Sequence, residues 1–221
     1  MKGLFGGLVC LFFLANATAQ TSNAKIYDGK EYVTGNTLVS GTPFYRNADH
    51  QENNSLLFDK VLYSGVPLLY DLKTDQLITR RPGEGINMIV VKEMVELFTV
   101  GKDTIVHLKE AGTGLADGFY LRVFDSPLYK SVARYKKTVK DPRSVNEKRY
   151  YEESVEYFIK TPATDTFVPL KSTAKLLSTD KKHKKNLKSL LRTHGMENSE
   201  NFPAKIALVL DYLNKANTAS I

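Results

Sequence analysis

The spacing of apolar and polar residues changes character once along the chain, near residue 171. Before this point, β-branched, aromatic and leucine residues form short runs between clusters of Gly, Asp, Asn and Pro, as in strands joined by tight turns. After it, leucines recur at helical spacing. We therefore predict an α+β fold. Residues 20–170 form a curved antiparallel sheet or a partly open β-barrel, and residues 171–217 form a C-terminal helical pair.

Nine runs have the composition of strands. They are Leu56–Tyr63, Val66–Leu72, Gln76–Arg80, Ile86–Val91, Val95–Val100, Thr104–Leu108, Gly118–Phe124, Leu128–Lys140 and Tyr150–Lys160. Their connections are mostly short, so we expect neighbouring strands to be antiparallel. The last three form a predicted meander, in which the lysine-rich middle strand pairs with the glutamates of the final strand.

Upstream of these runs the pattern is weaker. Asp28-Gly29 tolerates the positive φ of a tight turn, so we expect a hairpin between Ile26–Tyr27 and Lys30–Val33. The stretch Gly35–Ser55 is rich in Gly, Asn, Ser and Thr, which predicts a long loop with one short strand at Pro43–Arg46.

Two amphipathic helices are expected near the C-terminus. The first follows the N-cap candidates Ser178-Thr179-Asp180 and ends before Gly195, and the second begins at Pro203. Their apolar stripes consist of Leu187, Leu190 and Leu191, and of Ile206, Val209, Leu210 and Leu213. Both stripes need a surface to cover, so the helices should pack on the sheet. This polar, helical end disfavours the competing architecture, an outer-membrane barrel.

The first nineteen residues have the organisation of a secretory signal peptide. Met1-Lys2 supplies positive charge, Leu4–Leu14 is an apolar run too short to span a bilayer, and Ala17-Thr18-Ala19 is a small-x-small processing site. We expect cleavage between Ala19 and Gln20, which leaves one domain, residues 20–221, in the periplasm or outside the cell. A buried N-terminal helix is the alternative.

Cys10 is the only cysteine, and it lies inside this apolar run. The mature chain therefore has no disulfide, no thiolate nucleophile and no cysteine metal site. A lipid anchor at Cys10 is a minor alternative, because Cys10 follows Val9 instead of a small residue at the end of the run.

Basic residues are concentrated in the second half of the mature chain. Residues 20–120 contain ten Lys/Arg and thirteen Asp/Glu, whereas residues 121–221 contain twenty and eleven. Such a half suits nucleic acid, an anionic membrane surface or an acidic polymer, and export makes nucleic acid the least favoured. The densest run contains Lys181, Lys182, Lys184, Lys185 and Lys188. This run is a candidate contact with an anionic surface, and a solvated helix face is the alternative.

Three segments carry a resemblance to other proteins: Gly118-Phe119-Tyr120, Tyr135-Lys136-Lys137-Thr138 and the tail Ser172–Leu177. With them the chain resembles a group of small exported bacterial proteins of unknown function. The resemblance covers most of the mature chain and implies a Gram-negative cell envelope. It implies no catalytic residue.

Aromatic residues of the predicted strands are candidates for lining a ligand. They are Phe119, Tyr120, Tyr151 and Tyr157. In strands such rings usually fill the core. A curved sheet lined with them also suits an apolar ligand or a sugar.

No motif indicates a cofactor, a metal or a catalytic nucleophile. His50, His107, His183 and His194 are widely spaced, and Gly112–Gly118 lacks the Lys-Ser/Thr ending of a phosphate loop. A triad assembled from distant residues stays open, because such triads are recognised by geometry.

The leading hypothesis is therefore an exported, non-catalytic binding or structural module of the cell envelope that uses no cofactor. Its partner would be an envelope protein, a polymer or a small apolar ligand. An extracytoplasmic hydrolase is the alternative.

Overall fold

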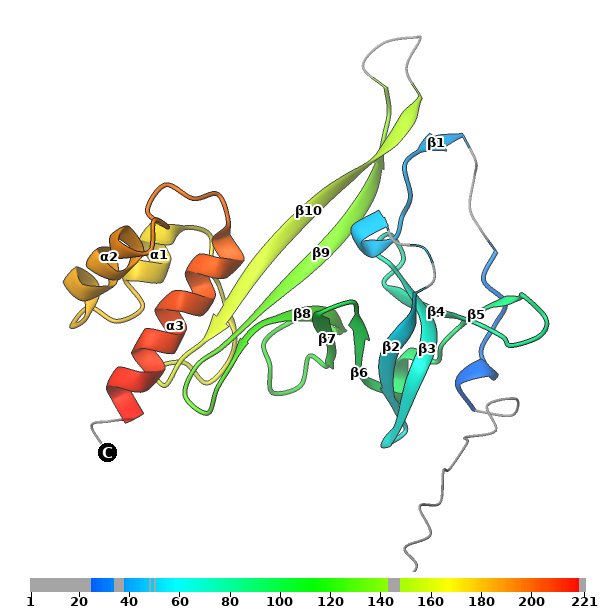
Figure 1. Ribbon diagram of the computed structural model, residues 1–221, viewed down its shortest axis with the longest axis horizontal. Coiled ribbons are helices and arrows are strands. Elements are labelled where there is room, and N and C mark those ends of the chain that lie inside the picture. The colour runs from blue at the N-terminus through cyan, green and yellow to red at the C-terminus, as the bar shows by residue number, and fades with distance from the viewer. Residues whose placement is uncertain (1–24, 34–37, 48, 50, 143–147, 219–221) are drawn as a thin grey trace, which may run out of the picture.

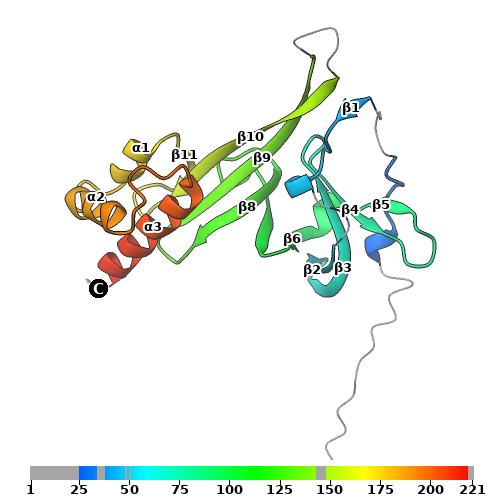
Figure 2. The same cartoon turned by 45° about the horizontal axis from the view of Figure 1, so that its top comes forward.

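The computed structural model describes residues 25–33, 38–47, 49, 51–142 and 148–218. The predicted signal peptide and its processing site at Ala19 and Gln20 lie outside these residues. Within them the chain forms the predicted α+β fold, with one large, open, curved sheet followed by three helices. In Figures 1 and 2 the helices form one end of the molecule and the early strands form the other.

The strands are β1 (Val39–Ser40), β2 (Gln51–Phe58), β3 (Val61–Asp71), β4 (Gln76–Arg80), β5 (Asn87–Ile89), β6 (Val95–Val100), β7 (Asp103–Leu108), β8 (Gly118–Asp125), β9 (Lys130–Lys140), β10 (Arg149–Lys160) and β11 (Val168–Pro169). The helices are α1 (Thr173–Leu177), α2 (Lys184–Thr193) and α3 (Phe202–Thr218).

The strand order in the sheet is β1-β10-β9-β8-β7-β6-β2-β3-β4-β5, and β11 pairs with β10. The pairs are antiparallel except β1 with β10, which is parallel. The predicted meander β8-β9-β10 is confirmed. Its β9–β10 hairpin pairs without interruption from Tyr150↔Lys140 to Lys160↔Lys130 and rises above the rest of the sheet in Figure 1.

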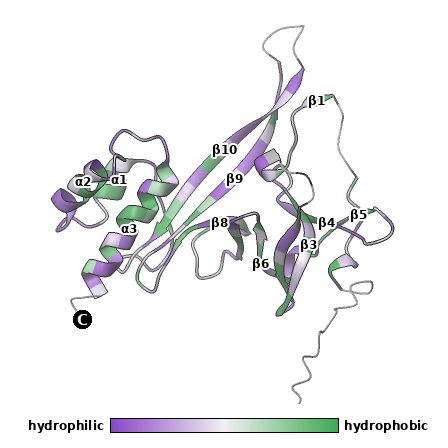
Figure 3. Ribbon diagram, viewed as in Figure 1, coloured by the Kyte–Doolittle hydropathy of each residue, from purple (hydrophilic) through white to green (hydrophobic). Residues whose placement is uncertain are grey.

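The hydrophobic core has three parts. In the first, residues of β2, β3, β4, β6, β7 and β8 pack with Ile26 and Tyr27 of the N-terminal segment, and Phe58, Phe98 and Phe119 are at most 1% exposed. A second cluster joins Ile159 and Leu170 to the apolar faces of the helices, and a smaller third cluster surrounds Tyr120, Val132 and Leu115. Figure 3 shows hydrophobic residues along the middle of α3 and hydrophilic residues at the outer end of α2.

The C-terminal region contains one more helix than the predicted pair. The short helix α1 begins after Ser172, whose hydroxyl accepts a hydrogen bond from the Lys175 N–H at 3.2 Å, a standard N-cap. The predicted cap residue Ser178 instead ends α1.

The apolar stripe predicted for the last helix is confirmed in α3. Its members Ile206, Val209, Leu210 and Leu213 are each 0% exposed.

The predicted hairpin at Asp28-Gly29 is wrong. Lys25–Tyr27 forms a short 3-10 helix, and the chain after it runs along β5, where the Ile89 N–H donates to the Lys30 carbonyl at 2.7 Å. Gly29 passes so close to β5 that a Cβ atom would lie 1.7 Å from the Ile89 carbonyl oxygen. The glycine is therefore required by a close backbone approach instead of a turn.

The boundary between β2 and β3 also differs from the prediction. β2 begins inside the predicted loop Gly35–Ser55, and the predicted strand Leu56–Tyr63 is broken after Phe58. Asp59 and Lys60 have φ values of 49° and 64°, the positive values of a two-residue hairpin turn. Such turns are usually recognised by Asn-Gly or Asp-Gly, so this pair gave no signal.

The segment before β2 crosses the sheet and is tied to β9. The predicted strand Pro43–Arg46 is wrong, because this stretch leads into a 3-10 turn at Tyr45–Asn47. Lys137 of β9 is 6% exposed, and its ammonium donates to the carbonyls of Thr42 at 3.0 Å and Phe44 at 2.8 Å. These bonds hold the segment against the β9–β10 hairpin.

Candidate functional site

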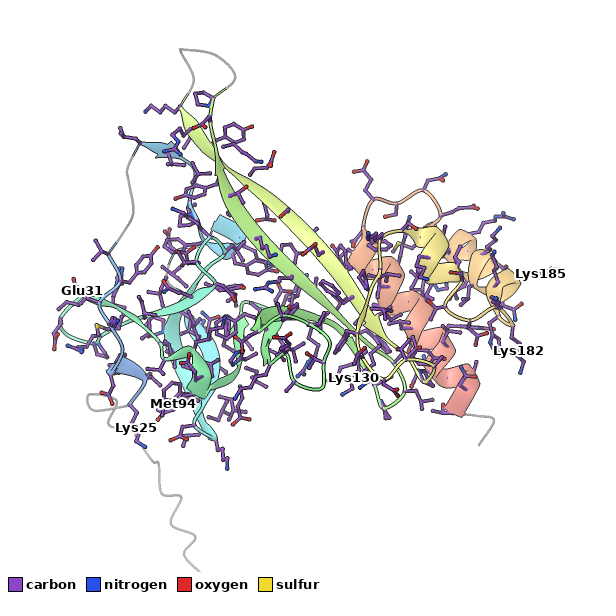
Figure 4. All side chains as sticks on the ribbon, turned by 180° about the vertical axis from the view of Figure 1, so that it is seen from behind. Lys25, Glu31, Met94, Lys130, Lys182 and Lys185 are labelled. Atoms are coloured by element: carbon purple, nitrogen blue, oxygen red, sulfur yellow. The ribbon has the colours of Figure 1, made fainter. Side chains whose placement is uncertain are left out.

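Five lysines form a cluster of like charge at the N-terminal end of α2. Lys181 and Lys182 lie in the turn before the helix, Lys184, Lys185 and Lys188 lie in its first turns, and all five are exposed. We call these five residues the basic surface. In Figure 4, Lys182 and Lys185 lie at the outer end of the molecule and point away from it.

The basic surface has no acidic partner among the described residues, in contrast to most charged positions of the sheet. Asp180, which precedes it, accepts hydrogen bonds from the His183 N–H at 3.2 Å and from Nδ1 at 3.0 Å. Burial raises the pKa of Asp180, but the bonds from His183 outweigh burial and hold this pKa below its usual value. The one nearby carboxylate in sequence is thus already occupied.

This charge distribution opposes the stability of α2. The N-terminal end of a helix is the positive end of its dipole, and α2 has no acidic residue in its first turn. Lys184 and Lys188 are also four residues apart, a spacing at which like charges repel. The helix is held instead by Leu187 and Leu191, which are 0% and 2% exposed in the cluster shared with α3.

The four candidate ligand-lining aromatics do not share one surface. Phe119 and Tyr120 are each 1% exposed and, as neighbours in β8, lie on opposite faces of the sheet. Phe119 packs against Phe98 with ring centroids 5.1 Å apart. Tyr151 and Tyr157 lie on β10 and are partly exposed. Of the four, these two reach the surface.

Tyr157 borders a groove of about 500 Å³ between β10, the segment after β11 and the start of α3. The walls include Val155, Pro169 and Phe202, and the rings of Tyr157 and Phe202 meet edge to face with centroids 5.1 Å apart. Burial, followed by the neighbouring Tyr135, raises the pKa of Tyr157, so its phenol stays protonated at neutral pH. The groove therefore has apolar walls, and the charged residues Glu156 and Lys171 also line it.

Sequence reasoning missed a polar cluster around Asp75. The Asp75 carboxylate accepts a hydrogen bond from the Tyr70 hydroxyl at 2.7 Å, pairs with the Lys92 ammonium at 2.8 Å and lies 3.5 Å from the Arg134 guanidinium. These residues come from the β3–β4 hairpin, the segment before β6 and strand β9. No local pattern in the sequence links such distant positions, and only the fold brings them together.

Lys92 extends this cluster to Asp117, 3.3 Å away, and His107 Nε2 lies 3.2 Å from the same carboxylate. Burial raises the pKa of Asp117, but the hydrogen bonds and charges of His107 and Lys92 lower it by more. The pKa of Asp117 therefore lies below its usual value. Asp75 and Lys92 also border an open pocket of about 530 Å³. Because each carboxylate lies beside a cation, the cluster is better suited to holding these strands together than to transferring a proton.

The histidines are separated in the fold. His107 lies in β7, His183 and His194 flank the two ends of α2, and His50 lies outside the described residues. Across the described ranges, no three His, Cys, Asp or Glu side chains are grouped as metal ligands would be. In the same part of the chain, no helix has the length and apolar character needed to cross a membrane.

The chain matches no protein-family model, and neither the curated proteins nor the solved structures contain a significant match to it.

Proposed function

We propose that the chain is an exported, non-catalytic binding module of the cell envelope, in the periplasm or secreted, that lies against an anionic surface through its helical end. The contact is the basic surface, Lys181, Lys182, Lys184, Lys185 and Lys188. Anionic phospholipid headgroups are the surface that we assign to it. The attraction is electrostatic and peripheral, since α2 buries its apolar stripe against α3 and keeps it from the bilayer.

The observation that carries this proposal is the unpaired charge at the wrong end of a helix. Five exposed ammonium groups surround the positive end of the α2 dipole without an acidic partner among the described residues. Elsewhere, three lysines of β9 are paired with glutamates of β10, as in Lys136 with Glu156 at 3.6 Å. A nearby anionic surface would relieve the repulsion in the basic surface, and each lysine near such a surface contributes about 1 kcal/mol.

A binding role rather than a catalytic one is supported by the polar cluster around Asp75. It brings several titratable side chains together, and its carboxylates lie within 3.5 Å of Lys92, Arg134 and His107. The side chain of His107 is 3% exposed and beyond the reach of a large substrate.

The proposal is tested by sedimentation with lipid vesicles. The wild-type protein should sediment with vesicles that contain phosphatidylglycerol but not with vesicles of phosphatidylcholine alone. Binding should disappear as salt rises from about 0.05 M to about 0.5 M, because exposed charges are screened within a few ångströms at high salt. Replacement of all five lysines of the basic surface by glutamine should lower the partition coefficient at least about 100-fold.

A matched variant controls for net charge. Lys30, Lys60, Lys73, Lys102 and Lys109 are also exposed, but they are spread over the sheet. Their replacement by glutamine removes the same five charges and should leave vesicle binding within about threefold of wild type. Equal losses in the two variants would mean that only net charge matters, and equal binding of wild type and the basic-surface variant would reject the contact.

A further inference from the structure

The long strand β10 has one fully paired edge and one partly open edge. Along the first edge, β9 pairs with β10 from Tyr150 to Lys160. Along the second edge, β1 pairs at Arg149 and Tyr150, and β11 pairs at Phe158 and Ile159. Among the residues that the structure describes, no strand pairs with residues 151–156 on this second edge. In Figures 1 and 2, the middle of β10 runs without a neighbour on that side.

The direction of the backbone groups at this opening follows from the neighbouring contact. The Leu170 N–H donates to the Tyr157 carbonyl at 2.8 Å, so Tyr157 directs its carbonyl to the β11 side. Along a strand, alternate residues direct their N–H and C=O groups to the same edge. Val155 and Glu153 therefore present their backbone donors and acceptors at the open edge, where both residues are exposed.

We propose that the open edge of β10 binds an extended, basic segment of a partner protein, which pairs as an added strand between β1 and β11. Residues 151–156 span about 20 Å at the rise of a strand, which is enough for a partner segment of about six residues. Main-chain hydrogen bonds to an exposed sheet edge are an established mode of peptide recognition. The proposal is independent of the lipid contact assigned to the basic surface.

The charge of the open edge selects the chemistry of the partner. Glu152, Glu153 and Glu156 are grouped on this stretch, and their side chains are 52%, 43% and 62% exposed. Their cations, Lys140, Lys137 and Lys136, lie on β9 at 3.3 to 3.8 Å and leave the outer side uncovered. Exposed ion pairs are weak and exchange partners readily. Glu152 and Glu156 share one face of the sheet and Glu153 lies on the other, so lysine or arginine residues at alternate positions of an added strand would lie beside Glu152 and Glu156.

The same charges disfavour pairing between two copies of β10. An antiparallel pair centred on Ser154 would place Glu152 of each copy opposite Glu156 of the other, and like charges directly opposite each other are destabilising. This register of a self-pair is therefore disfavoured, and the partner segment that we propose has a different sequence.

The groove at the end of the open edge adds a preference for one apolar residue. Val155, which is 39% exposed, belongs to the open edge and also lines the groove of about 500 Å³, together with Tyr157. Phe202 of α3 also lines it and contacts Tyr157. A side chain such as leucine at the end of the added strand would enter this groove.

The test uses a fluorescent peptide of about seven residues, in which lysine alternates with threonine and leucine is terminal. Binding is measured by fluorescence anisotropy without lipid. Two further peptides carry N-methyl groups on alternate amide nitrogens. In one peptide the methyl groups lie along the first edge of the extended chain, and in the other they lie along the second edge. An added strand bonds through one edge only, so one methylated peptide should bind within threefold of the parent and the other at least tenfold more weakly. Equal binding of the two methylated peptides would show charge attraction alone and would overturn the proposal.

Protein variants test the same edge from the other side. Val155→Pro removes an N–H that faces the opening and leaves the ladder with β9 intact, since proline is tolerated at strand edges. It should weaken peptide binding at least tenfold, while Val155→Thr, which keeps the N–H, should not. Glu152→Gln with Glu156→Gln should weaken binding about tenfold. If the parent peptide does not bind wild type, or if sedimentation shows a dimer that Val155→Pro dissolves, the basic-partner proposal is wrong.

Discussion

At the scale of single residues, two contacts stabilise parts of the fold that the hydrophobic pattern does not predict. One is a close approach between backbone segments, and the other is a carboxylate that accepts hydrogen bonds within a turn. Gly29 lies against the carbonyl of Ile89, which belongs to a paired strand and has little freedom to shift. Asp180 holds the turn before α2 through His183. The sequence predicted a hairpin turn at Gly29 and a helix cap at Asp180, and it did not predict these contacts.

Gly29→Ala should lower the free energy of unfolding by about 3 kcal/mol or more, because the new Cβ atom meets backbone that is held in the sheet. Gly112→Ala provides the comparison. Gly112 has φ +77° but open space around it, so this variant should cost only about 1 kcal/mol of backbone strain. Urea unfolding monitored by circular dichroism measures both values. Equal costs would mean that the segment around Gly29 moves away from β5 without penalty.

Asp180→Asn should make stability less dependent on acidic pH. The pKa of Asp180 is lowered in the folded protein, so its stabilisation is complete above its unfolded value near 3.8 and is lost as pH falls through the folded value. The variant should be about 1 kcal/mol less stable than wild type at pH 6, and the difference should shrink between about pH 4 and pH 2. Thermal melts at several pH values give this comparison. A difference that stays constant to pH 2 would contradict the role of the ionised carboxylate.

At the scale of secondary structure elements, the sequence predicts those with a clear period. β6 matches its predicted bounds, and the β8-β9-β10 meander and the α3 stripe were found from alternation and helical spacing. The misses have two physical causes. A hairpin turn formed by Asp59 and Lys60 adopts positive φ without glycine, and β1 is two residues long and defined by a strand far along the chain.

For the surfaces, too, local sequence patterns were informative and contacts between distant elements were not predicted. The basic surface is contiguous in sequence, so a charge run identified its five lysines before the fold was known. The cluster around Asp75 and the open edge of β10 depend on contacts between distant elements, and no periodicity predicts such contacts. Phe119 and Tyr120 are aromatic residues of the kind that lines ligand sites. In the structure both are buried, and because they are neighbours in β8 their side chains lie on opposite faces of the sheet.

Leu210→Ala in α3 should lower the free energy of unfolding by about 3 kcal/mol, because Leu210 is 0% exposed between the helices and the sheet. Leu208 lies two positions earlier on the same helix and is only partly buried. Leu208→Ala should therefore cost less than about 1.5 kcal/mol. Equal losses in urea unfolding would indicate that α3 does not pack through the stripe described above.

At the scale of the whole molecule, the basic surface and the open edge of β10 belong to different regions. The basic surface lies at the outer end of α2, and the open edge lies in the middle of the long hairpin. The basic surface consists of lysines without an acidic partner among the described residues, whereas the open edge carries glutamates that lie 3.3 to 3.8 Å from lysines of β9. The first would attract anionic lipid, and the second would bind a basic polypeptide segment by exchange of these ion pairs. The protein would then connect a surface to a partner.

The two surfaces should act independently. Val155→Pro should sediment with phosphatidylglycerol vesicles as wild type does, and the five-glutamine variant of the basic surface should bind the basic peptide within about threefold of wild type. Sites without shared contacts usually contribute additively. Loss of both activities in either variant would point to a common structural defect, which circular dichroism would reveal.

The parallel pair of β1 with β10 has a consequence for how the chain acquires its structure. Val39 pairs with Arg149, and the Lys137 ammonium donates to the carbonyls of Thr42 and Phe44. Residues 39–44 therefore form these contacts with residues that are synthesised much later. Contacts between such distant positions are slow to form, because a long loop must close before they stabilise anything. A nascent chain that has emerged only as far as β8 has neither partner for this segment. These contacts of residues 39–44 therefore cannot form until the β9–β10 hairpin has been synthesised, whereas the bridge of Phe44 with Asp71 can form earlier.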